Sequence, residues 1–273
     1  MKVVALHKYP VKSLRGIELE SCAVDRNGLT GDRRWMVVDR AGKFQTIREF
    51  PVMTQITVEE TDDGLILHHA KFGTATAKRP SLADATRAIT VWKHSGSALS
   101  VELSPCNFLS EILGLEVGIV YLGDLYSRPV NPEFGQPGDY TNFSDAYPIL
   151  LTSTASLDEL NEKLDNNIDM ERFRPNIVID GEIPWGEDEW KVIRIAELNF
   201  RVAKPCDRCV VTTRDHLTGK QIDALEPLRT LGKIHRASNG KIMFGQNIIP
   251  DNEGSLKIGD NVEVLQAGTS NLL

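Results

Sequence analysis

The sequence predicts a mainly β protein with a β-barrel architecture, and three observations lead to this expectation. Most of the 273 residues fall into short segments rich in β-branched and aromatic side chains, several of which alternate between apolar and polar positions. Turn-forming pairs such as Asn27-Gly28 and Asp63-Gly64 separate these segments. Only a few short stretches have the apolar spacing of a helix, and closely spaced strands with so few helices favour a barrel.

The strand candidates lie in both halves of the chain. Ile56 and Val58 alternate with polar neighbours, as expected of a strand with one buried face. In the first part, the candidates are Val3–Tyr9, Ile17–Val24, Trp35–Asp39, Gln55–Glu60, Leu65–His68 and Ile89–Trp92. In the second half, they are Asn176–Ile179, Val192–Ile195, Phe200–Ala203, Cys209–Thr213 and a terminal pair around Gly259-Asp260. The segment 127–147, rich in Pro, Gly, Asn and Asp, is expected to be a long functional loop or a domain connection.

Three short helices are also predicted. Ser104 can cap a helix that has Pro105 at its first position and ends at Gly114. Ser156 begins the capping box Ser-Leu-Asp-Glu, after which leucines continue at helical spacing. A third, shorter helix is expected to follow Pro227.

Charge is unevenly distributed along the chain. The protein has 31 Lys and Arg against 38 Asp and Glu, a formal net charge of −7, yet its first 48 residues carry ten Lys and Arg against five acidic residues. The overall acidic character argues against nucleic-acid binding. A basic segment within an acidic protein suits a small anionic ligand, and a solvated strand face explains that segment equally well.

The sequence predicts neither a membrane segment nor secretion. No stretch approaches the ~18 consecutive apolar residues that a membrane-spanning helix needs, and the first residues turn polar too soon for a signal peptide. The four cysteines, Cys22, Cys106, Cys206 and Cys209, are too few for a disulfide scaffold in a chain of this length. We therefore expect a cytoplasmic protein.

The most specific local pattern is the pair Cys206 and Cys209. Thioredoxin-like redox chemistry needs the first cysteine at the start of a helix, whereas this pair is followed by Val-Val-Thr-Thr, a strand-like sequence. A structural zinc site needs two more ligands, and no second pair with this spacing exists. Two buried structural cysteines are the plain alternative. The nearby cations Lys204, Arg208 and Arg214 favour a thiolate, the form that binds soft metal ions.

Several motifs, in order along nearly the whole chain, resemble a known family. Tyr9–Gly16 and Gly31–Trp35 are similar to the N-terminal β-barrel that accompanies MOSC domains. The segments that resemble the MOSC domain itself are Asn142–Asp145, Phe173–Val178, Cys206–Cys209 with Thr212-Thr213, and Phe244–Asn247. Within this family, the chain resembles the amidoxime-reducing components of mitochondria and their bacterial counterparts.

The resemblance implies an N-terminal MOSC-associated β-barrel over residues 1–100 and a C-terminal MOSC β-barrel domain over residues 101–273, with a few short helices. It implies a molybdenum cofactor bound as a single pterin dithiolene (molybdenum-molybdopterin). Cys209 is then the metal ligand and catalytic residue. The resemblance assigns no role to Cys206, which we expect to be structural. The other implied cofactor-binding residues are Lys12, Ser13, Arg33, Ser144, Arg174, Asn176, Arg208 and Asn247. Pyridoxal phosphate binding is a further family-level expectation.

The implied activity is the reduction of small N-hydroxylated compounds, such as hydroxylamines, amidoximes and N-hydroxylated bases. No iron–sulfur spacing, flavin motif or haem motif is visible, so we expect a separate flavin or iron–sulfur protein to supply electrons. A sulfur-carrier or cofactor-binding protein that holds a persulfide on Cys209 is the alternative of another class. A structural barrel without redox activity is the third possibility.

Overall fold

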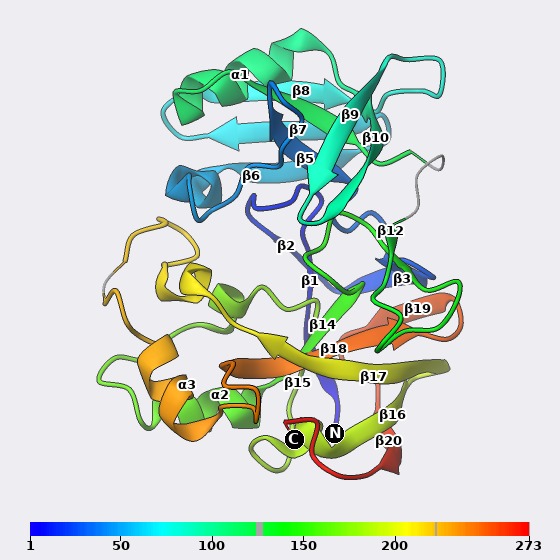
Figure 1. Ribbon diagram of the computed structural model, residues 1–273, viewed down its shortest axis with the longest axis vertical. Coiled ribbons are helices and arrows are strands. Elements are labelled where there is room, and N and C mark those ends of the chain that lie inside the picture. Colours follow the sequence, from blue (N-terminus) through cyan, green and yellow to red (C-terminus); the bar gives the residue numbers. More distant parts are fainter. Residues whose placement is uncertain (124–127, 222, 273) are drawn as a thin grey trace.

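The structure is mostly β with a curled half-barrel sheet, which confirms the predicted fold class. The computed structural model describes residues 1–123, 128–221 and 223–272. An eight-stranded sheet forms the lower part of the molecule in Figure 1, and β14 and β15 are its parallel pair. In spatial order, its strands are β2 (Ile17–Leu19), β1 (Val3–Lys8), β15 (Ile177–Ile179), β14 (Ile149–Ser153), β18 (Met243–Pro250), β17 (Leu198–Asp207), β16 (Trp190–Ile195) and β20 (Val262–Ala267).

Two smaller sheets and helix α1 (Leu103–Leu113) form the upper part of the molecule in Figure 1. The first sheet contains β5 (Trp35–Asp39), β11 (Val117–Tyr121), β10 (His94–Ser100) and β9 (Thr86–Val91). The second contains β6 (Thr57–Thr61), β7 (Gly64–His69) and β8 (Gly73–Lys78). Leu109 of α1 shares an apolar core with Val37 of β5 and Leu67 of β7. Because β11 pairs with β5, the upper part extends past residue 100, and the exact domain boundary stays a prediction.

Strand pairing joins the first and last parts of the chain. β1 pairs with β15, and β3 (Ser21–Asp25) pairs with β4 (Gly28–Leu29) and with β19 (Gly254–Lys257). Residues from the basic N-terminal segment therefore share a sheet with residues from the second half.

The predicted functional loop 127–147 contains a short strand pair. β12 (Arg128–Pro129) pairs with β13 (Tyr140–Thr141), and residue 127 of that loop lies outside the described residues.

The predicted helices exist, but the two N-terminal caps predicted at Ser104 and Ser156 are wrong. α1 begins at Leu103 with Glu102 before it, so Ser104 lies inside the helix, whereas Gly114 ends it in the left-handed conformation as predicted. The third helix, α3 (Leu228–Ile234), follows Pro227 as predicted. No helix in the described ranges is long and apolar enough to cross a membrane.

Ser156 does not begin α2, because tertiary contacts take up its hydroxyl. α2 (Thr154–Asn161) starts two residues earlier. The Ser156 Oγ is buried, donates to the Glu187 carboxylate at 2.8 Å and accepts the backbone N–H of Trp185 at 2.8 Å. The capping-box sequence thus serves the contact between α2 and the short 3-10 helix η3 (Gly186–Glu189).

The predicted strand Cys209–Thr213 is also wrong. β17 ends at Asp207, and Val210–Thr213 form a turn of 3-10 helix, η4. The hydroxyls of Thr212 and Thr213 donate to the carbonyl oxygens of Cys209 and Val210 at 3.0 and 2.8 Å. Such local hydrogen bonds compete with strand pairing, so β-branched residues here adopt a turn. The other 3-10 helices are η1 (Pro51–Gln55) and η2 (Met170–Phe173).

A buried carboxylate, Asp32, joins β1 to the loop before β15. It is 1% exposed. It accepts hydrogen bonds from the Tyr9 backbone N–H at 2.8 Å, the Arg33 guanidinium at 2.6 Å and the Asn176 side-chain amide at 3.1 Å. Tyr9 directly follows β1 and Asn176 directly precedes β15. Asp32 therefore fixes where these two segments meet.

We expect Asp32→Asn to lower the free energy of unfolding by about 3 kcal/mol, because it leaves a largely buried guanidinium without its carboxylate. Urea unfolding followed by tryptophan fluorescence measures this change. The matched control is Asp62→Asn, an exposed carboxylate after β6, which should change stability by less than about 0.5 kcal/mol. Wild-type stability of Asp32→Asn would contradict the role given to Asp32.

Candidate active site

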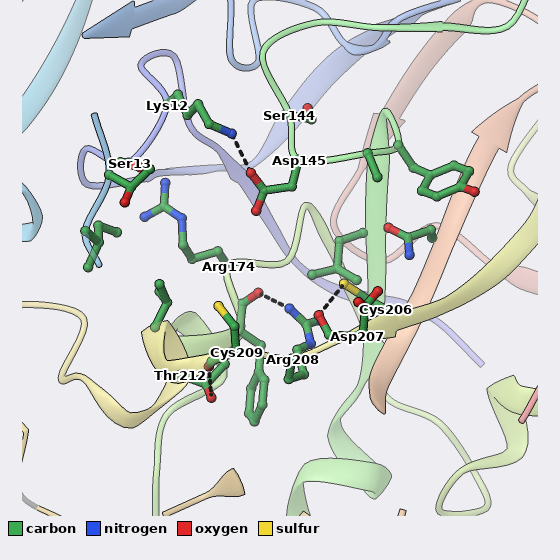
Figure 2. Close-up of a pocket in the computed structure, with 18 of the residues that line it drawn as sticks. Lys12, Ser13, Ser144, Asp145, Arg174, Cys206, Asp207, Arg208, Cys209 and Thr212 are labelled. Atoms are coloured by element: carbon green, nitrogen blue, oxygen red, sulfur yellow. Dashed lines mark hydrogen bonds and ion pairs between the residues drawn. The ribbon is translucent and has the colours of Figure 1, made fainter. Parts of the chain in front are cut away.

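A cavity of about 420 Å³ is lined by residues from both parts of the molecule (Figure 2). Its described lining includes seven Lys and Arg side chains and two carboxylates, in a protein whose formal net charge is −7. The residues predicted from the sequence all line it, namely Lys12, Ser13, Arg33, Ser144, Arg174, Asn176, Arg208, Cys209 and Asn247. Positive charge is therefore concentrated where these distant positions converge.

Lys12 is a buried cation on the cavity wall. It is 5% exposed, and its Nζ donates to the carbonyl oxygen of Phe143 at 2.8 Å and to Asp145 Oδ1 at 2.5 Å. Burial lowers the pKa of Lys12 to about 8, although the Asp145 carboxylate acts in the opposite direction. The positive charge of Lys12 is therefore lost at mildly basic pH.

Arg33 and Asn176 hold each other in place beside Asp32. Arg33 Nη1 donates to Asn176 Oδ1 at 3.0 Å, and Arg33 Nη2 donates to the carbonyl oxygen of Arg174 at 3.3 Å. Asn176 Nδ2 donates to the carbonyl oxygen of His7 at 3.2 Å and to Asp32. The Asn176 amide is thus occupied by protein groups, which indicates that it positions Arg33.

Arg174 reaches into the cavity with an unpaired donor (Figure 2). Its guanidinium carbon lies 4.1 Å from the ring centre of Tyr9, and that of Arg33 lies 4.2 Å from the same ring. Arg174 Nη2 is buried and has no hydrogen-bond partner. Burial lowers the pKa of Arg174 to about 10, so the side chain stays charged at neutral pH. A buried, unpaired guanidinium nitrogen is costly unless an anion or water faces it.

Strained backbone gathers around this cavity. Six non-glycine residues of the described chain have a positive φ, and four of them line the cavity. These four are Ser13 (70°), Arg33 (48°), Trp92 (55°) and Arg174 (56°). The left-handed region costs a non-glycine residue roughly 1 kcal/mol or more, and such strain is common at binding and catalytic sites. Three of the four were predicted as site residues from the sequence.

The loop Asn142–Asp145 is held in place by Arg128, which sequence reasoning missed. Arg128 is 2% exposed and donates to the carbonyl oxygens of Asn142, Ser144 and Asp145 at 3.2, 2.6 and 2.8 Å. The Ser144 Oγ is buried and has no hydrogen-bond partner, so it is available to a ligand. The only sequence signal for Arg128 was its place in the Pro- and Gly-rich segment 127–147.

The two cysteines of the pair have different surroundings (Figure 2). Cys209 Sγ accepts a hydrogen bond from Arg48 Nη2 at 3.3 Å. Burial raises the pKa of the Cys206 thiol, whose Sγ lies 3.9 Å from the carbonyl oxygen of Asp207. Both thiols are free, and among the described residues neither belongs to a group of three or more His, Cys, Asp or Glu ligands. This geometry favours two separate roles over a zinc site.

Arg208 and Asn247 line the cavity but use their donors on carbonyl oxygens. Arg208 donates to the carbonyl oxygen of Phe244 at 2.7 and 2.9 Å and to that of Phe173 at 3.0 Å. Asn247 Nδ2 donates to the carbonyl oxygen of Lys204 at 3.3 Å. Since Arg208 links the end of β17 to β18 and η2, it fixes the segment that carries Cys209.

Sequence reasoning also missed Arg48, Trp92 and Arg172 as lining residues. The Arg48 guanidinium carbon lies 4.8 Å from the ring centre of Trp92, so the two form one wall beside Cys209. Arg48 was counted in the basic N-terminal segment, but no motif separated it from the solvated cations there.

The chain matches two known domain families, one after the other along its sequence. Residues 1–116 match the MOSC N-terminal beta barrel domain, and residues 139–263 match the MOSC domain. Mitochondrial amidoxime-reducing component 1 of Homo sapiens is 30% identical over 282 residues, and that of Mus musculus is 31% identical, each match covering 96% of this chain and 82% of the relative. The molybdenum cofactor sulfurase of Oryza sativa subsp. japonica is 28% identical, over 87% of this chain and 31% of the sulfurase. The chain therefore belongs to the family of MOSC-domain proteins that includes the mitochondrial amidoxime-reducing components.

Proposed function

We propose that this chain is a molybdenum-dependent reductase of N-hydroxylated compounds, with Cys209 as the sulfur ligand of the metal. The observation that carries the proposal is convergence, because eight predicted residues between positions 12 and 247 line one cation-rich cavity together with Cys209. The relatives named amidoxime-reducing components support the reaction class. The relative named molybdenum cofactor sulfurase supports the metal.

The donors in the cavity fit a pterin cofactor that ends in a phosphate. Arg174 Nη2 and Ser144 Oγ are buried and have no hydrogen-bond partner, and Lys12 is a buried cation beside them on the cavity wall. A phosphate dianion accepts hydrogen bonds from guanidinium, ammonium and hydroxyl groups of this kind. The cavity volume of about 420 Å³ also lies within the range usual for small-molecule sites.

Cys209 fits the role of a soft metal ligand. Its Sγ accepts a hydrogen bond from Arg48 Nη2, and cysteine sulfur is a ligand that soft metal centres select. When bound, the molybdenum cofactor supplies two-electron chemistry and a position that accepts the substrate's oxygen. The protein holds the binding groups in place: Arg208 fixes the turn that carries Cys209, and Asn176 orients Arg33.

A second cavity, of about 1470 Å³, adjoins the first and is a suitable approach for the substrate. The two cavities share Arg48, Trp92 and Tyr147, and Phe44 adds a further aromatic side chain to the second one. Flat amidoximes and N-hydroxylated bases can stack on such rings, which gives affinity without strict selection for one compound.

The same proposal covers organisation and location. The N-terminal barrel, over about residues 1–100, supplies Lys12, Arg33 and Arg48, and the MOSC domain, over about 101–273, supplies Cys209. The four cysteines are free in the structure, which suits a reducing compartment such as the cytoplasm. Pyridoxal phosphate binding stays a family-level prediction.

Cys209→Ser is expected to lower kcat for benzamidoxime reduction by at least about 100-fold, because a hydroxyl is a poor ligand for a soft metal. Cys206→Ser is the matched control, and its activity per folded molecule should stay within about threefold of wild type. Steady-state kinetics on protein made in a host that synthesises the cofactor, with circular dichroism to verify folding, measures both. An equal loss in the two folded variants would point instead to a paired redox or zinc site.

Anion binding by cofactor-free protein is expected to weaken as pH rises. With sulfate as the probe, whose charge is constant, Kd should rise about tenfold from pH 7 to pH 9, because Lys12 loses its proton around pH 8. Lys12→Met should remove this pH dependence, whereas Arg174→Gln should weaken binding at every pH. Arg15→Gln, outside the cavity lining, is the control. A pH-independent Kd for the wild-type protein would exclude Lys12 from the anion site.

A separate flavin or iron–sulfur protein is expected to deliver electrons near the cavity. The isolated, molybdenum-loaded chain should not oxidise NADH or NADPH, yet it should reduce benzamidoxime when a reduced viologen dye supplies electrons. With a donor protein, the rate should fall as salt increases, because such encounters are steered by charge. Turnover driven by NADH or NADPH without a partner would contradict this expectation.

Measuring the molybdenum content of the protein distinguishes the proposed reductase from the alternative, a sulfur carrier. A sulfur carrier with a persulfide on Cys209 is favoured by the match to a molybdenum cofactor sulfurase. Only the reductase requires about one molybdenum atom per chain for activity. A fully loaded chain that is inactive with the viologen dye would favour the sulfur carrier.

A further inference from the structure

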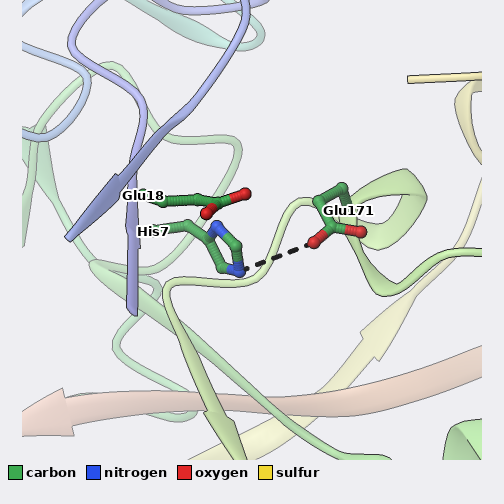
Figure 3. Close-up of side chains that lie close together, drawn as sticks. All are labelled: His7, Glu18 and Glu171. Carbon is green, nitrogen blue, oxygen red and sulfur yellow. Dashed lines mark ion pairs between the residues drawn. The ribbon is translucent and has the colours of Figure 1, made fainter. Parts of the chain in front are cut away.

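Three potential metal ligands lie together outside the active-site cavity (Figure 3). His7 in β1 and Glu18 in β2 are direct cross-strand partners, and Glu171 belongs to η2. One ligand atom from each side chain lies within 4.8 Å of the other two, and His7 Nε2 is 3.9 Å from Glu171 Oε1. The proposed function gives none of these side chains a role.

His7 is the member of this group that needs a partner. The residue is 4% exposed, and its buried Nε2, which faces the Glu171 carboxylate in Figure 3, has no hydrogen-bond partner. A buried polar atom left unpaired destabilises the folded state. The ion pairs of the described residues include none between Lys or Arg and either Glu18 or Glu171. The group thus combines an unpaired nitrogen with two carboxylates that form no ion pair with Lys or Arg in the described part of the chain.

We propose that His7, Glu18 and Glu171 bind a divalent transition-metal ion, with Zn²⁺ as the best match. An imidazole nitrogen together with carboxylate oxygens is a donor set that Zn²⁺ uses in proteins. Ca²⁺ and Mg²⁺ prefer oxygen ligands alone, so the imidazole selects against them. The ion would satisfy the buried nitrogen and balance both carboxylates at once.

The His7–Glu171 pair requires only a small contraction, whereas the Glu18 ligand atom must move in from a position within 4.8 Å of the other two. Zinc bonds of about 2.0–2.2 Å in a tetrahedral arrangement place the ligand atoms roughly 3.4 Å apart. The His7–Glu171 separation of 3.9 Å is close to this value. Glu18 is exposed and the Glu171 side chain is 33% exposed, so both can adjust, and water can complete the coordination.

The ion would act as a positioning clamp for the active site. It would link β1 and β2 to η2, whose last turn leads to Arg174, and the Arg174 N–H donates to the Glu171 carbonyl oxygen at 3.0 Å. Tyr9, the ring on which Arg174 stacks, follows His7 by two residues. Zinc binding does not depend on the identity of the cofactor, so this proposal and the proposed function can fail separately.

A neighbouring group, Asp169, Asp215 and His216, offers a matched control. His216 Nδ1 lies 3.6 Å from Asp169 Oδ2, and the His216 side chain is 22% exposed. The His216 Nδ1 is also buried without a hydrogen-bond partner, but the His216 side chain is more exposed than that of His7, which is 5% exposed. If the ion belongs to the His7 group, removing His216 should leave its affinity unchanged.

Isothermal titration with ZnCl₂ tests the proposal. Because the thiols of Cys206 and Cys209 also bind zinc, the parent protein is the full chain with both changed to serine. We expect one site in the parent, and affinity at least tenfold weaker in His7→Gln and Glu18→Gln. His216→Gln and Glu111→Gln, a distant exposed carboxylate in α1, should stay within twofold. At zinc 100-fold above Kd, the Tm of the parent should rise by roughly 5 °C.

Three results would overturn the proposal. One is unchanged zinc affinity in Glu18→Gln, a variant of an exposed residue that should fold even if His7→Gln does not. Another is loss of binding in His216→Gln with binding retained in His7→Gln, which would place the ion in the neighbouring group. The third is CaCl₂ binding as tightly as ZnCl₂, which would exclude the imidazole as a ligand.

Discussion

The active-site geometry depends on the hydrogen bonds that the buried Asp32 carboxylate accepts. This carboxylate accepts hydrogen bonds from Tyr9, Arg33 and Asn176, three residues on segments that are far apart in the sequence. A carboxylate this deeply buried is tolerated only because all of these donors face it. The ion pair with Arg33 places that side chain at the cavity, and the hydrogen bonds from Tyr9 and Asn176 link the segments next to β1 and β15.

The cavity wall has several features that are unfavourable for the folded state, and a bound anion would offset part of their cost. The wall gathers cations within an acidic protein, lowers the pKa of Lys12 and Arg174 by burial, and keeps four non-glycine residues at positive φ. None of these features by itself stabilises the fold. Together they favour the binding of a negatively charged group, because its charge would offset the repulsion among the cations and its oxygens would accept from the unpaired donors.

Most of the fold class could be predicted from the sequence, and two of the errors come from hydrogen bonds made by side-chain hydroxyls. Periodicity and turn residues located many strands and all three helices, because these signals act within a few residues. The cap at Ser156 failed because Glu187, outside the helix, takes its hydroxyl. The strand at Cys209–Thr213 failed because threonine hydroxyls bond to their own turn. In both cases, hydrogen bonds of particular side chains outweighed a sequence pattern that usually predicts the structure correctly.

The sequence by itself determined a mainly β chain, a basic N-terminal segment and a set of polar residues whose types suit an anionic cofactor and a soft metal. Only the tertiary structure decided which of these residues leave a donor free for a ligand and which bind other protein groups. Arg174 keeps an unpaired nitrogen in the cavity, whereas Arg208 and Asn176 use their groups on the protein. The physical reason is that a donor is free only when folding brings no acceptor within about 3 Å of it. The carbonyl oxygens that decide this are 35 residues away for Arg208 and 169 residues away for Asn176, beyond the range of any sequence pattern.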